Sequence, residues 1–307
     1  MSRTTHAPRP RRGIRSTRSL TVLGVVVAAV TAALLVPVFA DDDSALTLGP
    51  VADTTISQVP QDGDNSLNTP EVWRLVWGDD FTGDTLDRSR WNLRNNEARD
   101  VDLGCNVNSP KNTFVGGGSL TLRALRENAT CGSQTRQYTQ SYLDTIGIAS
   151  FTYGRFEIRA KSPNRPEDST GLWPAFWLRP DDSGNGEIDV TELPGGAEWY
   201  AKSTAGIFWD YTPVKQDTRL ALPSGGYPGD GFHTYTTDWD ANALKWYIDG
   251  KLVWTRDRST TPWYDPAFNK PYNIRLNFQV GGWLGAPDAR TRFPADFVVD
   301  YVRVYQR

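Results

Sequence analysis

The amino-acid sequence predicts an all-β protein, built as a sandwich or a barrel. Short segments alternate between apolar and polar residues, as strands with one buried face do. Turn signals rich in Gly, Asn and Asp separate these segments. After the first 40 residues, no apolar pattern of helical period continues over a helix-length stretch. Many short strands without helices, in a domain of this size, are typical of these two architectures.

The first 40 residues have the features of an export signal. An apolar run over residues 20–40 ends in Val38-Phe39-Ala40, which suits signal peptidase. We therefore expect residues 1–40 to be a cleaved signal peptide and the protein to be secreted. Because a membrane-spanning helix needs about 20 apolar residues, an anchor formed by residues 20–40 is the alternative. The basic residues before the run are Arg3, Arg9, Arg11, Arg12, Arg15 and Arg18.

The rest of the chain divides into a linker and one large domain. Residues 41–70 are acidic and polar, which favours a flexible linker, so we expect the folded domain over residues 71–307. Without residues 1–40 the chain has 27 basic and 36 acidic residues, a formal net charge of −9. That charge argues against nucleic acid or an anionic membrane as partner. It suits a soluble extracellular protein that acts on a neutral polymer. We also expect the protein to be a monomer.

Within the domain, four stretches are predicted to contain strands. Residues 119–124 and 153–161 alternate at period two. Residues 244–254 alternate on both sides of Asp249-Gly250, a dipeptide that favours a β-hairpin turn. Residues 297–305 form the last predicted strand.

The two cysteines, Cys105 and Cys131, are expected to form a disulfide. In an exported chain, a pair 26 residues apart is typical of a bridge that closes one local loop. Such a bridge contributes about 3–4 kcal/mol in the chain-entropy account. The chain has two histidines, and His6 leaves with the signal. A histidine-based zinc site is therefore nearly excluded, and a Ser-His-Asp triad could be built only on His233.

Three carboxylates lie close together in the segment Gly-Glu-Ile-Asp-Val-Thr-Glu. Strict alternation places Glu187 and Asp189 on one face, with Ile188 and Val190 toward a core, and turns Glu192 away. One extra residue, a β-bulge between Asp189 and Glu192, returns Glu192 to the shared face. The sequence thus predicts a bulged strand with three carboxylates on one surface.

Three interpretations of this surface are open. A solvated polar face is common on strands, and carboxylates are also good ligands for calcium. The third interpretation is catalytic, because crowded carboxylates raise the pKa of at least one of them. A retaining glycosidase needs one ionised carboxylate to attack and one protonated carboxyl to donate, about 5–5.5 Å apart.

Further motifs lie on both sides of the carboxylate segment, which has the form Glu-x-Asp-x-x-Glu. They occupy residues 73–77, 79–81, 86–87, 91–92, 151–157, 171–178, 232–235, 249–250, 280–282 and 299–305. In this order they resemble glycoside hydrolase family sixteen, in its laminarinase-like form of secreted bacterial endo-β-1,3-glucanases. The resemblance spans essentially all of residues 71–307. The extra bulge residue distinguishes this form from lichenase-like relatives, whose motif is one residue shorter.

The resemblance implies a β-jelly-roll, a sandwich of two curved antiparallel sheets with a concave sugar-binding cleft. It implies a retaining glycoside hydrolase that cleaves internal β-glucosidic bonds by double displacement. Glu187 would be the nucleophile and Glu192 the acid/base. Asp189 between them would hold the nucleophile and modulate its electrostatics. No cofactor is implied for catalysis.

The resemblance also implies binding residues. Trp173 and Trp177 match positions that line the cleft, and Arg155 matches a cleft-side position. Trp283 matches a platform position after a Gly-Gly pair. The alternatives are a structural ion pair of Arg155 with Glu157 or another carboxylate, and loop packing of Trp283.

Family members often hold a structural calcium ion on the convex side, and Asp300 matches one of its ligands. His233 is expected to be structural. Three departures concern the substrate: Phe208 stands near the position where relatives often have histidine, residues 142–149 differ from the commoner form of that segment, and the loop after Gly282 is unusual. The leading hypothesis is therefore hydrolysis of β-1,3-glucan. Mixed-linkage glucan or galactan as substrate, transglycosylation, and sugar binding without catalysis are the alternatives.

Overall fold

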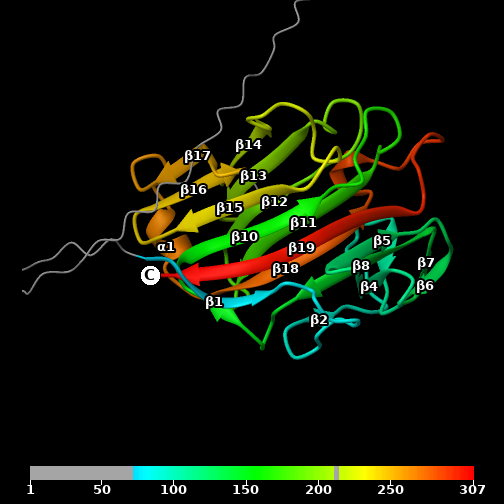
Figure 1. The fold of residues 1–307 in the computed structure, drawn as a ribbon, viewed down its shortest axis with the longest axis horizontal. Helices are drawn as coiled ribbons and strands as arrows, with labels where there is room; N and C mark the ends of the chain where they lie inside the picture. Colours follow the sequence, from blue (N-terminus) through cyan, green and yellow to red (C-terminus); the bar gives the residue numbers. More distant parts are fainter. Residues whose placement is uncertain (1–71, 211–213) are drawn as a thin grey trace, which may run out of the picture. The chain divides into compact units, whose positions relative to one another are not determined.

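Two large β-sheets make up most of the structure, a computed structural model that describes residues 72–210 and 214–307 (Figure 1). The predicted signal segment, residues 1–40, and the predicted linker, residues 41–70, lie outside the described residues. Within the described part, no helix has the length and apolar character needed to cross a membrane.

Sheet A contains eight strands, with β19 near its centre and β1 paired to β19 beside the main order. In spatial order they are β17 (Lys251–Asp257), β16 (Ala243–Ile248), β15 (His233–Trp239), β10 (Gly154–Lys161), β19 (Ala295–Gln306), β5 (Ser119–Ala124) and β4 (Thr113–Gly116), with β1 (Arg74–Asp79).

Sheet B contains nine strands, and it carries the predicted carboxylate strand, β12. In spatial order they are β14 (Lys215–Ala221), β13 (Lys202–Phe208), β12 (Glu187–Glu192), β11 (Leu172–Pro180), β18 (Tyr272–Val280), β8 (Tyr138–Asp144) and β2 (Asn92–Leu93), with β3 (Gly104–Asn106) on β8 and β9 (Ser150–Phe151) on β18. All pairs in both sheets are antiparallel except β3 with β8.

The remaining described elements are small. They are the hairpin of β6 (Ala129–Cys131) and β7 (Gln134–Arg136), the five-residue helix α1 (Tyr264–Phe268) and the 3₁₀ turn η1 (Gly282–Leu284). The prediction of an all-β sandwich of two antiparallel sheets is confirmed.

The apolar faces of the two sheets pack together as the core. In β10, Phe156 and Ile158 are fully buried, while the alternate residues Arg155, Glu157 and Arg159 are partly exposed. In β12, Ile188 and Val190 point into the same core. Burying a side chain of this size stabilises the fold by about 1.5–3 kcal/mol, so alternation fixes which face of each strand turns outward.

Two local predictions are also confirmed. Asp249 and Gly250 join β16 to β17 with positive φ angles of 49° and 73°, as the two central residues of a type I′ hairpin turn require. A disulfide joins Cys105 to Cys131, with Cα atoms 5.6 Å apart.

Candidate active site

The carboxylate strand β12 contains the predicted bulge. Asp189 lies opposite Gly206 of β13 and Glu192 lies opposite Thr204, so three steps along β12 match two along β13. The extra residue turns Glu192 to the same outer face as Glu187 and Asp189. Where the bulge interrupts the ladder, Trp246 of sheet A donates a hydrogen bond to the carbonyl oxygen of Asp189, over 2.8 Å.

The outer face of sheet B is hollowed into a cleft of about 530 Å³, and all three carboxylates line it. Three of the predicted binding residues, Trp173, Trp177 and Trp283, line the same cleft. The other lining residues are Arg99, Ala175, Trp199, Thr204, Phe208, Lys215, Asp217, Thr218, Arg219, Asn277 and Gln279.

Glu192 is held by two hydrogen-bond donors. Trp173 Nε1 donates to Oε1 and Thr204 Oγ1 donates to Oε2, each over 2.9 Å. Burial, opposed by these two donors and reinforced by the charge of Glu187, raises the pKa of Glu192 from 4.5 to about 7. Glu192 is therefore protonated over much of the range below pH 7, as a general acid must be.

Asp189 is the most buried of the three carboxylates, at 3% exposure. Burial first, then the charges of Glu187 and Glu192, and further that of Asp217, raise the pKa of Asp189 well above its ordinary value. This favours its neutral form, which can donate a hydrogen bond to an ionised neighbour. The side chain fits because residue 206 is glycine: a Cβ atom there would lie 2.8 Å from Asp189 Oδ2.

Glu187 is buried beside a cation. Its exposure is 6%, and its Oε2 atom lies 3.4 Å from Nη1 of Arg179, one strand away on β11. The guanidinium can pair with the ionised carboxylate, the form that a nucleophile needs. Glu187 and Glu192 therefore differ in environment: one lies near a cation, and the other is protonated by burial.

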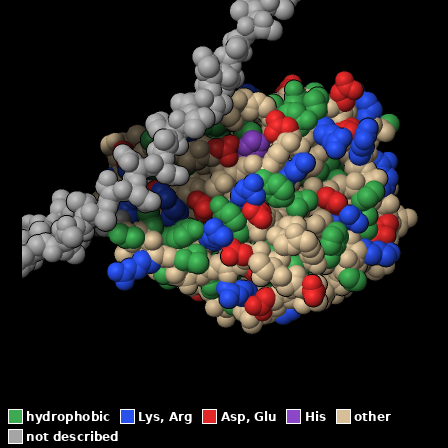
Figure 2. Space-filling model, in the orientation of Figure 1, with side chains coloured by type: hydrophobic (Ala, Val, Ile, Leu, Met, Phe, Trp, Pro, Cys, Tyr) green, Lys and Arg blue, Asp and Glu red, His purple; other side chains and the backbone are tan. Residues whose placement is uncertain are grey.

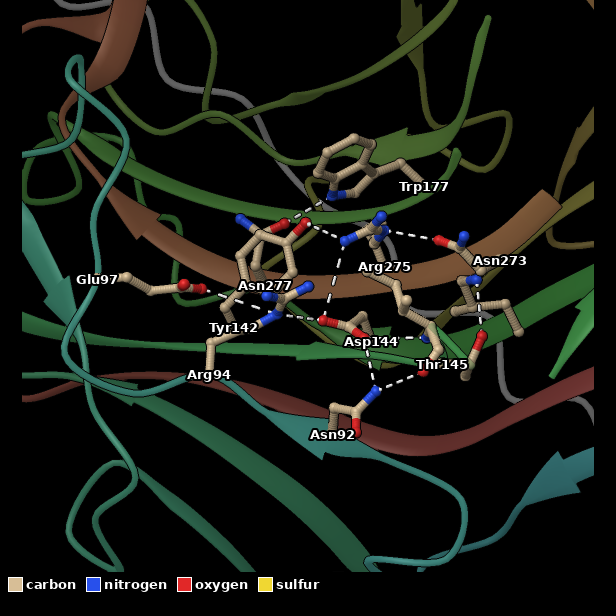
Figure 3. A network of polar contacts seen from close by, with 12 residues as sticks. Asn92, Arg94, Glu97, Tyr142, Asp144, Thr145, Trp177, Asn273, Arg275 and Asn277 are labelled. Carbon is tan, nitrogen blue, oxygen red and sulfur yellow. Dashed lines mark hydrogen bonds and ion pairs between the residues drawn. The ribbon is translucent and has the colours of Figure 1, made fainter. Parts of the chain in front are cut away.

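At the floor of the cleft, Trp177 is joined to a polar network on β18, β8 and β2 (Figure 3). Trp177 Nε1 donates to Asn277 Oδ1 over 2.7 Å, and the indole meets the Tyr142 ring edge-on. Beyond them Asp144, which is fully buried, is paired with Arg94 and Arg275 and accepts a hydrogen bond from Asn92. The network fixes the floor, and with it the orientation of Trp177.

Arg155 is the predicted cleft residue that the structure places elsewhere. It lies on the outer face of β10 in sheet A, so the whole core separates it from the cleft. Its guanidinium pairs with Asp238 through bonds of 2.6 and 2.8 Å and stacks on Trp73. Arg155 therefore forms a structural ion pair, as the alternative interpretation proposed, and its partner is Asp238 rather than Glu157.

Figure 2 shows acidic and basic side chains interspersed over the face in view.

The predicted calcium ligand Asp300 also lies in sheet A, on β19. Its carboxylate is paired with Arg159, with Oδ2 and Nη1 2.5 Å apart. Among the described residues, no group of three or more His, Cys, Asp or Glu side chains is arranged to hold a metal ion. Calcium also binds backbone carbonyl oxygens and water, so a structural calcium ion at Asp300 stays a prediction. His233 lies between Asp230 and Asp249, at 3.1 and 2.9 Å, away from the residues that line the cleft.

Several residues that line the cleft were not predicted from the sequence. Trp199 belongs to the loop after β12, and nothing in a loop's sequence tells which way an indole points. Lys215, Asp217 and Arg219 occupy every second position of β14. Their alternation was the available signal, since three charged residues at period two mark one face of a strand.

Comparisons with known proteins agree with this geometry. A family model described as glycosyl hydrolases family 16 matches residues 106–303. The chain is 31% identical to glucan endo-1,3-beta-glucosidase A1 of Niallia circulans and 32% identical to a beta-glucanase of Rhodothermus marinus, each over 79% of this chain. It is also similar to the solved catalytic domain of an endo-1,3-beta-glucanase (laminarinase) from Thermotoga petrophila. That match has a TM-score of 0.67 and 29% identity, and covers 76% of this chain and 98% of the other.

The coverage of the two sequence relatives differs. The match spans 40% of the Niallia protein and 88% of the Rhodothermus protein. The family match includes β12, so it contains the bulged strand and all three carboxylates. By sequence, fold and site, the chain belongs to glycosyl hydrolase family 16.

Proposed function

We propose that the protein hydrolyses internal β-1,3-glucosidic bonds of a glucan with retention of configuration. The observation that carries this proposal is the bulged strand, with Glu187 beside a cation and Glu192 protonated up to about pH 7. Two groups with opposite protonation states on one face are the requirement of a retaining glycosidase. The β-1,3 linkage is supported by the activities that give the Niallia and Thermotoga relatives their names.

Two steps follow from this arrangement. In the first, Glu192 gives its proton to the glycosidic oxygen while a carboxylate oxygen of Glu187 attacks the anomeric carbon. The leaving sugar departs with the proton, and a glycosyl ester forms on Glu187. In the second, Glu192, now ionised, takes a proton from water as the water attacks the same carbon. The ester bond to Glu187 breaks, and both carboxyl groups return to their starting states.

Asp189 supports both steps without taking part in bond exchange. Its raised pKa favours a neutral carboxyl between the two reacting groups. A neutral Asp189 adds no charge to repel the anionic form of Glu187. The chemistry thus rests on three side chains and water, and it needs no cofactor.

The substrate is tested by incubating the purified protein with laminarin, lichenan, agarose and xyloglucan and counting new reducing ends. Release from laminarin is expected. Release from another polymer alone would retain the mechanism and reject the β-1,3 linkage. Products longer than an added oligosaccharide would indicate transglycosylation, and tight binding without cleavage would indicate a sugar-binding protein.

The donors to Glu192 provide a test of its role by pH. Thr204 donates to the ionised form, so its loss disfavours that form and raises the pKa of Glu192. In Thr204→Val, the alkaline limb of kcat/KM on laminarin is therefore expected to move up from about pH 7, by roughly one pH unit. The control Thr204→Ser keeps the hydroxyl and should leave the limb in place. An unmoved or lowered limb in the valine variant contradicts the assignment.

A further inference from the structure

The edge strand of sheet B, β14, presents three charged side chains to the cleft. Lys215, Asp217 and Arg219 are exposed and line it, while the residues between them are less exposed. Lys215 Nζ and Asp217 Oδ2 pair over 2.6 Å. Arg219 forms no ion pair with any carboxylate of the described residues. Charges on an edge strand often have no role beyond preventing unwanted strand pairing. These three side chains, however, lie in the same cleft as the catalytic carboxylates.

The pairing register connects these residues to the catalytic groups. Arg219 lies opposite Thr204, which in turn lies opposite Glu192. Asp217 is related in the same way to Asp189, and only Gly206 lies between them. Since neighbouring strands are about 4.8 Å apart, β14 lies roughly 10 Å from β12. A sugar that contacts β14 is therefore a neighbour of the reacting sugar, further along the chain.

A second connection between Glu192 and Arg219 runs through aromatic rings. Trp173, which donates to Glu192, meets Trp283 edge-on with centroids 5.2 Å apart, and Trp283 meets Trp199 at 4.8 Å. The guanidinium of Arg219 lies 3.7 Å from the centroid of Trp199. Stacking fixes the plane of a guanidinium and leaves its N–H edges available as paired donors. Arg219 is thus held in one orientation at the end of the cleft.

We propose that Arg219, held by Trp199, and the Lys215–Asp217 pair form a subsite for a sugar unit of the glucan beyond the bond that is cleaved. The guanidinium donates to neighbouring hydroxyls of that sugar, and Asp217 accepts from one. The ligand is an uncharged pyranose, as expected for the glucan of the proposed function, and Asp217 offsets the charge of Lys215. This subsite makes the enzyme's efficiency depend on chain length. The inference rests on the proposed function, since it extends the same cleft.

The test compares β-1,3-linked glucose trisaccharide and hexasaccharide as substrates of the whole protein. In Arg219→Gln, the ratio of hexasaccharide to trisaccharide kcat/KM is expected to fall roughly tenfold, the equivalent of one hydrogen bond from a charged group. The main cleavage position in end-labelled hexasaccharide should also move, which a purely structural role would not cause. Arg219→Lys should not restore the ratio, because an ammonium group has no planar fork. Arg88→Gln, an exposed site outside the cleft, is the matched control.

The outcomes separate the subsite from the proposed function. An unchanged ratio and cleavage position in Arg219→Gln, with an active wild type, overturns the subsite alone. Full recovery in Arg219→Lys overturns the hydroxyl-binding role in favour of a simple charge. A wild type that neither cleaves nor binds the hexasaccharide overturns both the proposed function and the subsite.

Discussion

Replacing Glu187 by alanine is expected to lower kcat/KM on β-1,3-glucan by at least about 10⁴-fold, because double displacement loses its nucleophile. The fold should persist, since the shortened side chain leaves space in an open cleft rather than in the core. Thermal unfolding checks the fold, and reducing-end release checks the activity. The matched control is Glu167→Ala, an exposed glutamate outside the cleft, which should keep full activity.

The same variant reports the geometry of attack. With an activated aryl β-glucoside, added azide should enter from the side that Glu187 vacated and yield the α-glycosyl azide. The configuration of that product is read by nuclear magnetic resonance. A β-azide, or activity close to that of the wild type, would show that Glu187 is not the nucleophile.

Replacing Glu192 by alanine is expected to have the second largest effect. Hydrolysis of the polysaccharide should fall about 10²–10⁴-fold, the usual contribution of a general acid. The alkaline limb near pH 7 should disappear, because the group responsible for it is gone. An aryl glycoside with a very acidic leaving group needs no proton, so formation of its glycosyl-enzyme should stay close to the wild-type rate.

Azide again separates the roles. In the Glu192 variant it attacks the glycosyl ester on Glu187, so the expected product is the β-glycosyl azide. Equal losses on polysaccharide and activated glycoside would contradict the acid/base role, since a proton donor matters only for a poor leaving group.

The catalytic strand could be predicted because its information is local. Alternation of Ile188 and Val190 with acids gives the strand and its faces, and the position of Glu192 requires the bulge that the structure contains. The hairpin at Asp249-Gly250 depends on an equally short-range signal, whereas the disulfide could be predicted because the chain has only two cysteines.

Other features needed the assembled fold. Alternation places Arg155 on an outward face of its strand. In a sandwich both sheets have an outward face, and only the strand order shows that β10 belongs to sheet A. In the wall of the cleft the rings of Trp199 and Trp283 are in contact, although the two residues come from loops that are far apart in sequence. Likewise the raised pKa of Glu192 depends on burial, which spacing does not give.

The two ends of the cleft floor differ in how they can evolve. Asp144 is fully buried between two arginines, and removing one partner of a buried charge commonly costs about 3–5 kcal/mol. That end can change only through simultaneous substitutions. On β14 the Lys215–Asp217 pair is exposed, and such a pair contributes about 0–1 kcal/mol. Single mutations there cost little stability, so descendants with new substrate preferences should differ first along β14.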